Sequence, residues 1–257
     1  MTPIDDGEPP TWQDLELSVA RILSEAGLCT ERGRLLATVR GCVEVDVYAE
    51  DQSITPPVVT LVECKHWKNA VPQTVVHAFR TTVIDSGANV GFIVSLRGFQ
   101  SGAVNAAALT NIHLVDWPAF QALFAERWYR KYAIERANKA LDPLLEYTEP
   151  MNSRIFRKAD ALPGPAQTEF GRLRDKHRGV GMMLPLFFYP GEPPAEMLDF
   201  RMPDLPLAQR LTPHRRAATG LPPEILDATS FRALLDAITA YAHQAIAEFD
   251  DVFSERA

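Results

Sequence analysis

A predicted strand that ends in charged residues is the feature that most constrains the fold of this chain. Residues 58–66, VVTLVECKH, are apolar at most positions until an acid and a lysine appear. Because side chains alternate between the two faces of a strand, Glu63 and Lys65 are expected on the same face. The sheet must therefore hold a carboxylate and an ammonium side by side at one end of an apolar strand.

A second strand precedes this one and supplies another acid. Residues 42–48, CVEVDVY, alternate strictly between apolar and polar positions, which is typical of a half-buried strand and places Asp46 on its polar side. The polar segment AEDQSITPP then leads into residues 58–66. The two strands are predicted to pair as an antiparallel hairpin with a long loop.

The remaining patterns in the first half of the chain alternate between helix and strand. Helices are predicted over 11–27, 73–86 and 101–110, with Thr11 and Ser101 as N-caps, and strands over 89–96 and 111–117. Strands separated by helices of about 10 to 15 residues indicate crossover connections and parallel pairing. The predicted fold class is α/β, a mixed β-sheet flanked by helices in the order α β β α β α β.

The second half of the chain has a different sequence pattern. Helical spacing continues over 118–145, so that residues 129–149 are expected to form a helical connector. The segment 160–223 holds most of the prolines, which predicts an irregular, loop-rich stretch. A last helix over 229–253 has apolar residues on a broad face, which would close the domain or contact a second subunit. The region 150–257 is therefore expected to be mainly helical and loop-rich, and its role is unassigned.

Composition narrows the class of protein. The 257 residues are 46% hydrophobic and 23% charged, as in ordinary globular proteins. The net charge of −7 argues against nonspecific coating of nucleic acid, which relies on Lys and Arg. One segment, 154–178, is locally basic, and it is either a solvated surface or a phosphate-contacting patch.

Cysteine spacing and hydropathy exclude further classes. The three cysteines form no CxxC pair, so no zinc site is predicted, and Cys42 and Cys64 are expected to be buried reduced thiols. No stretch approaches the roughly 18 consecutive apolar residues of a membrane span. The acidic start MTPIDDGEPP is unlike a signal peptide, so a cytoplasmic location is expected.

The three charged residues of the hairpin suggest a metal site. Two carboxylates a few ångströms apart repel each other unless a cation neutralises them. Mg²⁺ would do so at Asp46 and Glu63, with the carbonyl of Cys64 as a further ligand, because it prefers oxygen donors. Lys65 would then orient or help deprotonate an attacking water and stabilise charge on a phosphate. On spacing alone, an ordinary salt bridge on an exposed sheet face remains an equal alternative.

Longer stretches of the sequence resemble a known family. The segments GCVEVDV, LVECKHWKNAVPQTVVHAFR, DSGANVGFIVSLRGFQSGAVNAA and TNIHLVDW resemble the catalytic domain of Mrr-like restriction endonucleases, within the PD-(D/E)XK nuclease superfamily. The resemblance covers about residues 11–128. It implies a restriction-endonuclease-like fold and a metal-dependent DNA endonuclease that uses Mg²⁺, or Mn²⁺ in its place, in restriction or defence against foreign DNA.

The same resemblance assigns roles to individual residues. The acid of the first strand corresponds to Asp46, the E-x-K pair to Glu63 and Lys65, and a glutamate often found on the first helix to Glu16. Val45 stands where the motif has a proline, a position that the superfamily keeps loosely. The pattern of chemistry-bearing residues is otherwise intact, which favours an active nuclease.

Several alternatives stay open at the level of sequence. Gln73, at the start of its helix, is a candidate for contacting the metal-bound water or a phosphate, and a plain helix residue is the alternative. Glu16 is equally compatible with a solvated helix surface. A noncatalytic nucleic-acid-binding or interaction module with this fold, and an RNA-directed nuclease, are the rival functions. Because each DNA strand needs its own cut, double-strand cleavage by one active site per chain would suggest a homodimer.

Overall fold

The computed structural model describes residues 2–149, 151, 153–191, 202–210, 212 and 220–254. The chain divides into two compact units. One unit is Gly7–Lys131, and the other is Tyr132–Ala257 together with Met1–Asp6. Within the described residues, no helix is both long and apolar enough to cross a membrane.

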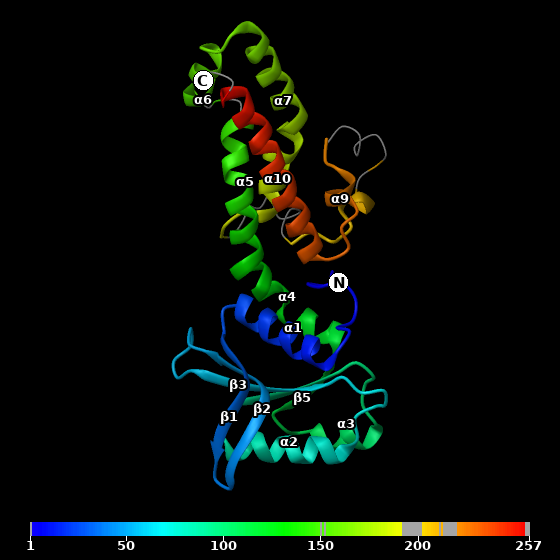
Figure 1. The fold of residues 1–257 in the computed structure, drawn as a ribbon. Helices are drawn as coiled ribbons and strands as arrows, with labels where there is room; N and C mark the ends of the chain where they lie inside the picture. Colours follow the sequence, from blue (N-terminus) through cyan, green and yellow to red (C-terminus); the bar gives the residue numbers. More distant parts are fainter. Residues whose placement is uncertain are drawn as a thin grey trace. The chain divides into compact units, whose positions relative to one another are not determined.

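The first unit is built on one mixed sheet of five strands (Figure 1). In spatial order the strands are β1 (Cys29–Thr38), β2 (Gly41–Asp51), β3 (Val58–Lys65), β4 (Val90–Ser95) and β5 (Ile112–Asp116). β1, β2 and β3 pair antiparallel, whereas β3, β4 and β5 pair parallel. The predicted hairpin and the predicted parallel pairing are both confirmed.

Helices cover both faces of this sheet (Figure 1). α1 (Trp12–Glu25) and α4 (Trp117–Trp128) lie on one side, and α2 (Gln73–Asp85) and α3 (Ser101–Ala107) lie on the other. Thr11 caps α1 as predicted, since its hydroxyl accepts the N–H of Asp14 at 3.2 Å. The predicted cap of α3 is shifted by one residue, because Gln100 rather than Ser101 occupies the N-cap.

Each face of the sheet has its own apolar contacts. On the α2 side, a buried cluster joins sheet residues to one stripe of the helix, and its members include Leu61, Ile93, Ile112, Val76, Phe79 and Val83. On the other side, the ring of Phe92 meets Phe120 and Phe124 of α4 edge-on. Burial on both faces explains why β3 and β4 read as nearly continuous apolar runs.

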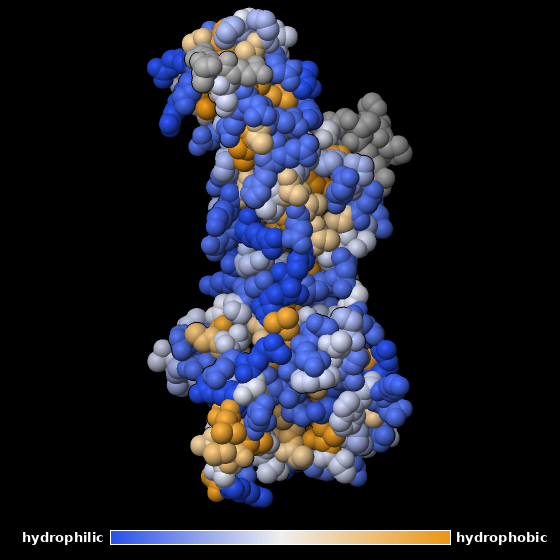
Figure 2. All heavy atoms as spheres, viewed as in Figure 1, coloured by the Kyte–Doolittle hydropathy of each residue, from blue (hydrophilic) through white to orange (hydrophobic). Residues whose placement is uncertain are grey.

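Strand β1 is absent from the predicted order, which is a correction. It is an edge strand whose residues are mostly exposed, so it lacks the apolar alternation that reveals a half-buried strand. The pairing of β1 with β2 is also interrupted at Gly33, which lies opposite Asp46 and has a positive φ of 59°. Figure 2 shows apolar side chains gathered at the lower end of this hairpin, where Leu35 and Val39 are exposed.

The cysteines follow the prediction only in part. All three are free, and Cys64 in the middle of the sheet is buried as expected. Cys42 is exposed, because it lies at the tip of the β1–β2 hairpin, where neither face is covered. The apolar neighbours of Cys42 in sequence therefore misled the prediction of a buried thiol.

The second unit is helical. Its long helices α5 (Ile134–Thr148), α7 (Gly164–Met183) and α10 (Phe231–Ser254) pack against one another. A π-helical segment, Tyr129–Ala133, connects α4 to α5. Shorter elements are α6 (Ser153–Asp160), the 3₁₀ helices Leu184–Phe188 and Leu207–Arg210, and α9 (Pro223–Leu226).

Helix α7 corrects the prediction of an irregular segment over 160–223. Its only proline, Pro165, lies in the first turn, where a missing N–H is harmless. The other prolines of the segment lie outside the helix, so averaging over the whole segment concealed a proline-free helical stretch. Gly181 lets α7 approach α5 closely, because a Cβ there would collide with Thr148. The prediction for 192–201, 211 and 213–219 lies outside the described residues.

The start of the chain belongs to the second unit. The carbonyls of Pro3 and Ile4 accept the N–H groups of Phe231 and Arg232 at 3.0 and 2.9 Å. These bonds satisfy donors that the first turn of a helix cannot pair internally. Residues more than 220 positions apart thus define the beginning of α10.

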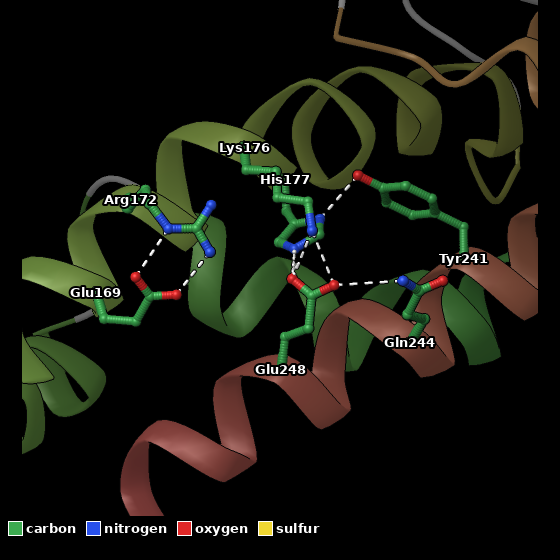
Figure 3. Close-up of polar contacts among 7 residues, drawn as sticks. All are labelled: Glu169, Arg172, Lys176, His177, Tyr241, Gln244 and Glu248. Carbon is green, nitrogen blue, oxygen red and sulfur yellow. Dashed lines mark hydrogen bonds and ion pairs between the residues drawn. The ribbon is translucent and has the colours of Figure 1, made fainter.

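A polar cluster links α7 to α10 (Figure 3). His177 is 1% exposed, and its Nδ1 and Nε2 lie 2.7 Å from the Tyr241 hydroxyl and 2.9 Å from Glu248. Burial lowers the pKa of His177, which favours the neutral imidazole. Because the Glu248 carboxylate can only accept, Nε2 is the donor and Nδ1 accepts from the Tyr241 hydroxyl. Burial would raise the pKa of Glu248, but bonds from Lys176 and His177 outweigh it and lower this pKa to about 2.

Candidate active site

Strand register brings two predicted acids to one place in the first unit. Val47 of β2 pairs with Val62 of β3, so Asp46 and Glu63 are the next opposing residues beyond the last ladder pair. Opposing residues on antiparallel strands point to the same face. In place of a further ladder bond, the N–H of Cys64 donates to Asp46 Oδ2 at 2.7 Å. The side chain of Asp46 is therefore anchored where the two strands separate.

The lysine of the motif is held by its glutamate. Lys65 Nζ donates to Glu63 Oε1, and both side chains are mostly buried. The alternative of an ordinary salt bridge on an exposed sheet face therefore does not describe their surroundings. Glu63 Oε2 and Asp46 Oδ1 have no hydrogen-bond partner within the described part of the chain. Each acid thus keeps one oxygen for a further ligand.

The acids share one electrostatic environment. Burial raises the pKa of Glu63, the nearby charge of Asp46 raises it further, and Lys65 partly offsets both. Burial and Asp46 likewise raise the pKa of Glu16, against the effects of Arg32 and Lys65. Two carboxylates whose pKa values rise through burial and like charge form a site where a cation is stabilising.

Glu16 joins this cluster from α1. Its carboxylate lies 3.4 Å from Arg32 of β1, and its side chain is mostly buried. The structure therefore turns Glu16 toward the sheet rather than toward solvent. Arg32 was not expected near the site, because its strand was not predicted.

Cys64 contributes through its backbone. Its thiol is buried, and burial followed by the neighbouring carboxylates raises the pKa of the thiol well above its ordinary value. The N–H and C=O of one strand residue point to the same edge, so the Cys64 carbonyl is directed toward β2, where Asp46 takes the N–H. This is the edge expected for a carbonyl that ligates an ion.

Gln73 stands apart from the other predicted residues. It is the first residue of α2, it is exposed, and its side chain lies against Gly102 of α3. Among the described residues, no hydrogen bond joins Gln73 to Asp46, Glu63 or Lys65. Any contact of Gln73 with a phosphate or a water is thus a separate hypothesis.

The loop after β4 uses its polar groups internally. Ser95 is buried and its hydroxyl donates to the Gly98 carbonyl at 3.1 Å, whereas Arg97 forms a two-pronged bond to Glu8 at 2.9 and 3.1 Å. These bonds shape the turn before α3. In this structure the polar groups of Ser95 and Arg97 are therefore engaged within the protein.

The donor set fits a divalent ion by its chemistry. Within the described residues, no group of three or more His, Cys, Asp or Glu side chains is close enough to hold a metal as placed. The two carboxylates that repel each other, the free oxygen on each and the carbonyl at the adjoining edge are nevertheless the hard oxygen donors that Mg²⁺ prefers. Asp46, Glu63 and the Cys64 carbonyl are the groups that would hold it.

Comparison with known proteins identifies the class of the first unit. Residues 10–124 match the family Mrr_cat, described as a restriction endonuclease. This part of the chain is a Mrr-like catalytic domain with the PD-(D/E)XK nuclease fold. The matched residues all lie within the first unit.

Two further comparisons add no functional information. No curated protein matches the chain at a significant level. One similar solved structure, described as the crystal structure of protein of unknown function AF1548, is 16% identical and covers 92% of this chain and 98% of that chain. Its TM-score of 0.36 is too low to carry an argument.

Proposed function

We propose that this chain is a metal-dependent DNA endonuclease that hydrolyses phosphodiester bonds in restriction or defence against foreign DNA. The observation that carries the proposal is the cluster of Asp46, Glu63 and Lys65 in a domain of the restriction endonuclease family. Burial and the nearby charge of Asp46 raise the pKa of Glu63. The ammonium of Lys65 donates a hydrogen bond to the same carboxylate.

The reaction requires a water, a base and stabilisation of negative charge. The oxygen of the water attacks phosphorus as the water gives up a proton to solvent, one phosphodiester P–O bond breaks, and the leaving oxygen takes up a proton. The products are a phosphomonoester and a hydroxyl group. Lys65 would orient the water and stabilise the charge that develops on the phosphate oxygens. Glu63 holds the ammonium in position, and Asp46 is fixed by the Cys64 N–H. A metal ion bound by Asp46 and Glu63 would lower the pKa of the water and polarise the phosphate.

A cleavage assay tests this proposal. Wild-type protein is incubated with plasmid and phage DNA, each with Mg²⁺, Mn²⁺ or EDTA, beside the variants Asp46→Ala and Lys65→Ala. Cleavage by the wild type only with a metal, and loss of cleavage in both variants, is the expected result. Lys139→Ala is the matched control, since Lys139 is exposed on α5 in the other unit.

Three outcomes of the assay would count against the proposal. Equal cleavage by all variants would show a contaminating nuclease or a different site. Absence of cleavage of every DNA substrate, together with metal-independent binding, would favour a noncatalytic nucleic-acid-binding module. Cleavage of RNA alone in a parallel set of reactions would move the substrate class from DNA to RNA.

A further inference from the structure

Two of the four tryptophans of this chain are exposed, and each is close in sequence to a residue of the candidate active site. Trp117 and Trp128 are 2% and 0% exposed, whereas Trp67 and Trp12 are 43% and 56% exposed. A large aromatic side chain left in water is informative when it lies beside polar groups that bind a ligand. Trp67 follows Lys65 by two residues, and Trp12 lies one helical turn before Glu16.

The ring of Trp67 lies beside the ammonium of the site. Lys65 Nζ is 5.3 Å from the centroid of this ring, within the range of a cation–π contact. The same ammonium donates to Glu63. Lys65 therefore contacts both a carboxylate of the cluster and an exposed aromatic side chain.

The loop that carries Trp67 is fixed at both ends. His66 Nε2 lies 3.0 Å from the Pro9 carbonyl, and the N–H of Val71 donates to the Gly98 carbonyl at 3.0 Å. The ring is therefore presented by an anchored loop, which reduces the entropy lost when it takes up a ligand. Pro9 lies just before Thr11 and Trp12, and His66 lies just before Trp67. The contact between His66 and Pro9 therefore joins the segments that precede the two exposed tryptophans.

We propose that Trp67 is a base-stacking residue, which binds an unpaired nucleobase of the strand whose phosphate lies at Lys65. This inference rests on the proposed nuclease function and adds a requirement for a base, unpaired or flipped out of the duplex, next to the bound phosphate. The ammonium is suited to the phosphate and the adjoining indole to the base, which are two parts of the same strand. Stacking of this kind tolerates any base, because every base has a π-face.

Binding in EDTA tests the proposal without any cleavage. Fluorescence anisotropy is measured with a labelled oligothymidylate and with a matched strand of abasic sugar-phosphate units. Wild-type protein is expected to bind the strand with bases about 5- to 150-fold more tightly, the range for one base stack. Trp67→Ala is expected to lose this preference, and Trp67→Phe, which keeps a ring, to retain part of it.

The tryptophan fluorescence supplies an independent readout. Because Trp117 and Trp128 are buried, quenching by the oligonucleotide should come from the exposed pair. Quenching that persists in Trp12→Phe and is lost in Trp67→Phe is expected. Quenching that follows Trp12 instead, or equal affinity of wild type and Trp67→Ala for the strand with bases, would overturn the proposal.

The two proposals fail in distinguishable ways. If the wild type cleaves DNA with a metal but binds abasic and normal strands equally, the stacking residue is refuted and the nuclease stands. If binding depends on Trp67 but no substrate is cleaved, stacking stands and the nuclease is refuted.

Discussion

The two units of the molecule each contain a cluster of acids and bases, and the clusters differ in how well their charges are satisfied. In the helical unit, Glu248 accepts hydrogen bonds from Lys176 and His177, and these bonds lower its pKa to about 2. In the nuclease domain, burial and the charge of Asp46 raise the pKa of Glu63 despite its bond to Lys65. The first cluster stabilises the fold by itself, whereas the second would be stabilised by an added cation.

This difference separates a structural cluster from a candidate catalytic one. A buried carboxylate with enough donors contributes stability, and its removal leaves buried partners without a charge to bind. A carboxylate with a raised pKa contributes little stability when ionised, and groups of this kind gather at functional sites.

The largest effect is expected from Glu63→Gln. This change removes the charge that holds Lys65 and that would bind the ion, so cleavage of plasmid DNA should fall about 100- to 1,000-fold. The unfolding midpoint should not fall, because the amide avoids both the burial of a charge and repulsion from Asp46. Cleavage at the wild-type rate would refute the assigned role of Glu63.

The matched change in the other unit, Glu248→Gln, should have the opposite profile. The free energy of unfolding should fall by about 1 to 3 kcal/mol, because His177 and Lys176 lose a charged acceptor. Urea unfolding followed by far-UV circular dichroism reports the helices of both units, among which α5, α7 and α10 of the helical unit are long. All four tryptophans lie in the nuclease domain, so their fluorescence reports that domain separately. Unchanged stability in both signals would show that the cluster is not structural.

The pH dependence should also differ in sign between the two acids. The lowered pKa of Glu248 means that its contribution to stability is present above about pH 4.5 and is lost as the pH falls toward about 2. The raised pKa of Glu63 means that its ionisation destabilises the fold, and protonation relieves this as the pH falls.

Differences between wild type and each variant across a pH series measure these contributions. The stability advantage of wild type over Glu248→Gln should shrink on acidification. Glu63→Gln should be more stable than wild type at neutral pH. This difference should also shrink on acidification, because the wild-type Glu63 becomes protonated. If both differences had the same sign at pH 7, the contrast between the clusters would not hold.

The smallest effect is expected from Arg32→Ala. The pair with Glu16 is long, at 3.4 Å, and Arg32 is partly exposed, so its loss should cost less than about 1 kcal/mol. Arg32 lowers the pKa of Glu16, so its removal should raise that pKa further. A carboxyl titration by NMR measures this shift, and an unchanged or lowered value would place Arg32 outside the electrostatic environment of the site.

Much of the nuclease fold follows from local patterns. Strands are predicted by the alternation in residues 42–48 and by the apolar runs of 58–66 and 89–96. Burial on one face gives alternation, and burial on both faces gives a continuous apolar run. Strand β1 has no such signal, since most of its residues are exposed at the sheet edge. Helix α7 was missed because the prolines that flank it dominated the composition of its surroundings.

The site was predictable in its residue types but not in its geometry. The E-x-K spacing places Glu63 and Lys65 on one face of any strand, and that arrangement needs only alternation. The bond from the Cys64 N–H to Asp46 depends on the register of two strands, which no single segment specifies. The approach of residues 3 and 4 to α10 likewise depends on contacts across nearly the whole chain.

In the nuclease domain, Asp46 and Glu63 are proposed to hold a divalent ion together. The most direct measurement is the unfolding midpoint of the nuclease domain, followed by tryptophan fluorescence, with and without Mn²⁺. Mn²⁺ should raise this midpoint in wild-type protein, because a ligand that binds only the folded state stabilises it. The rise should be absent in Asp46→Asn, whose amide oxygen can still accept the Cys64 N–H. An equal rise in both proteins, or no rise in the wild type, would contradict the claim.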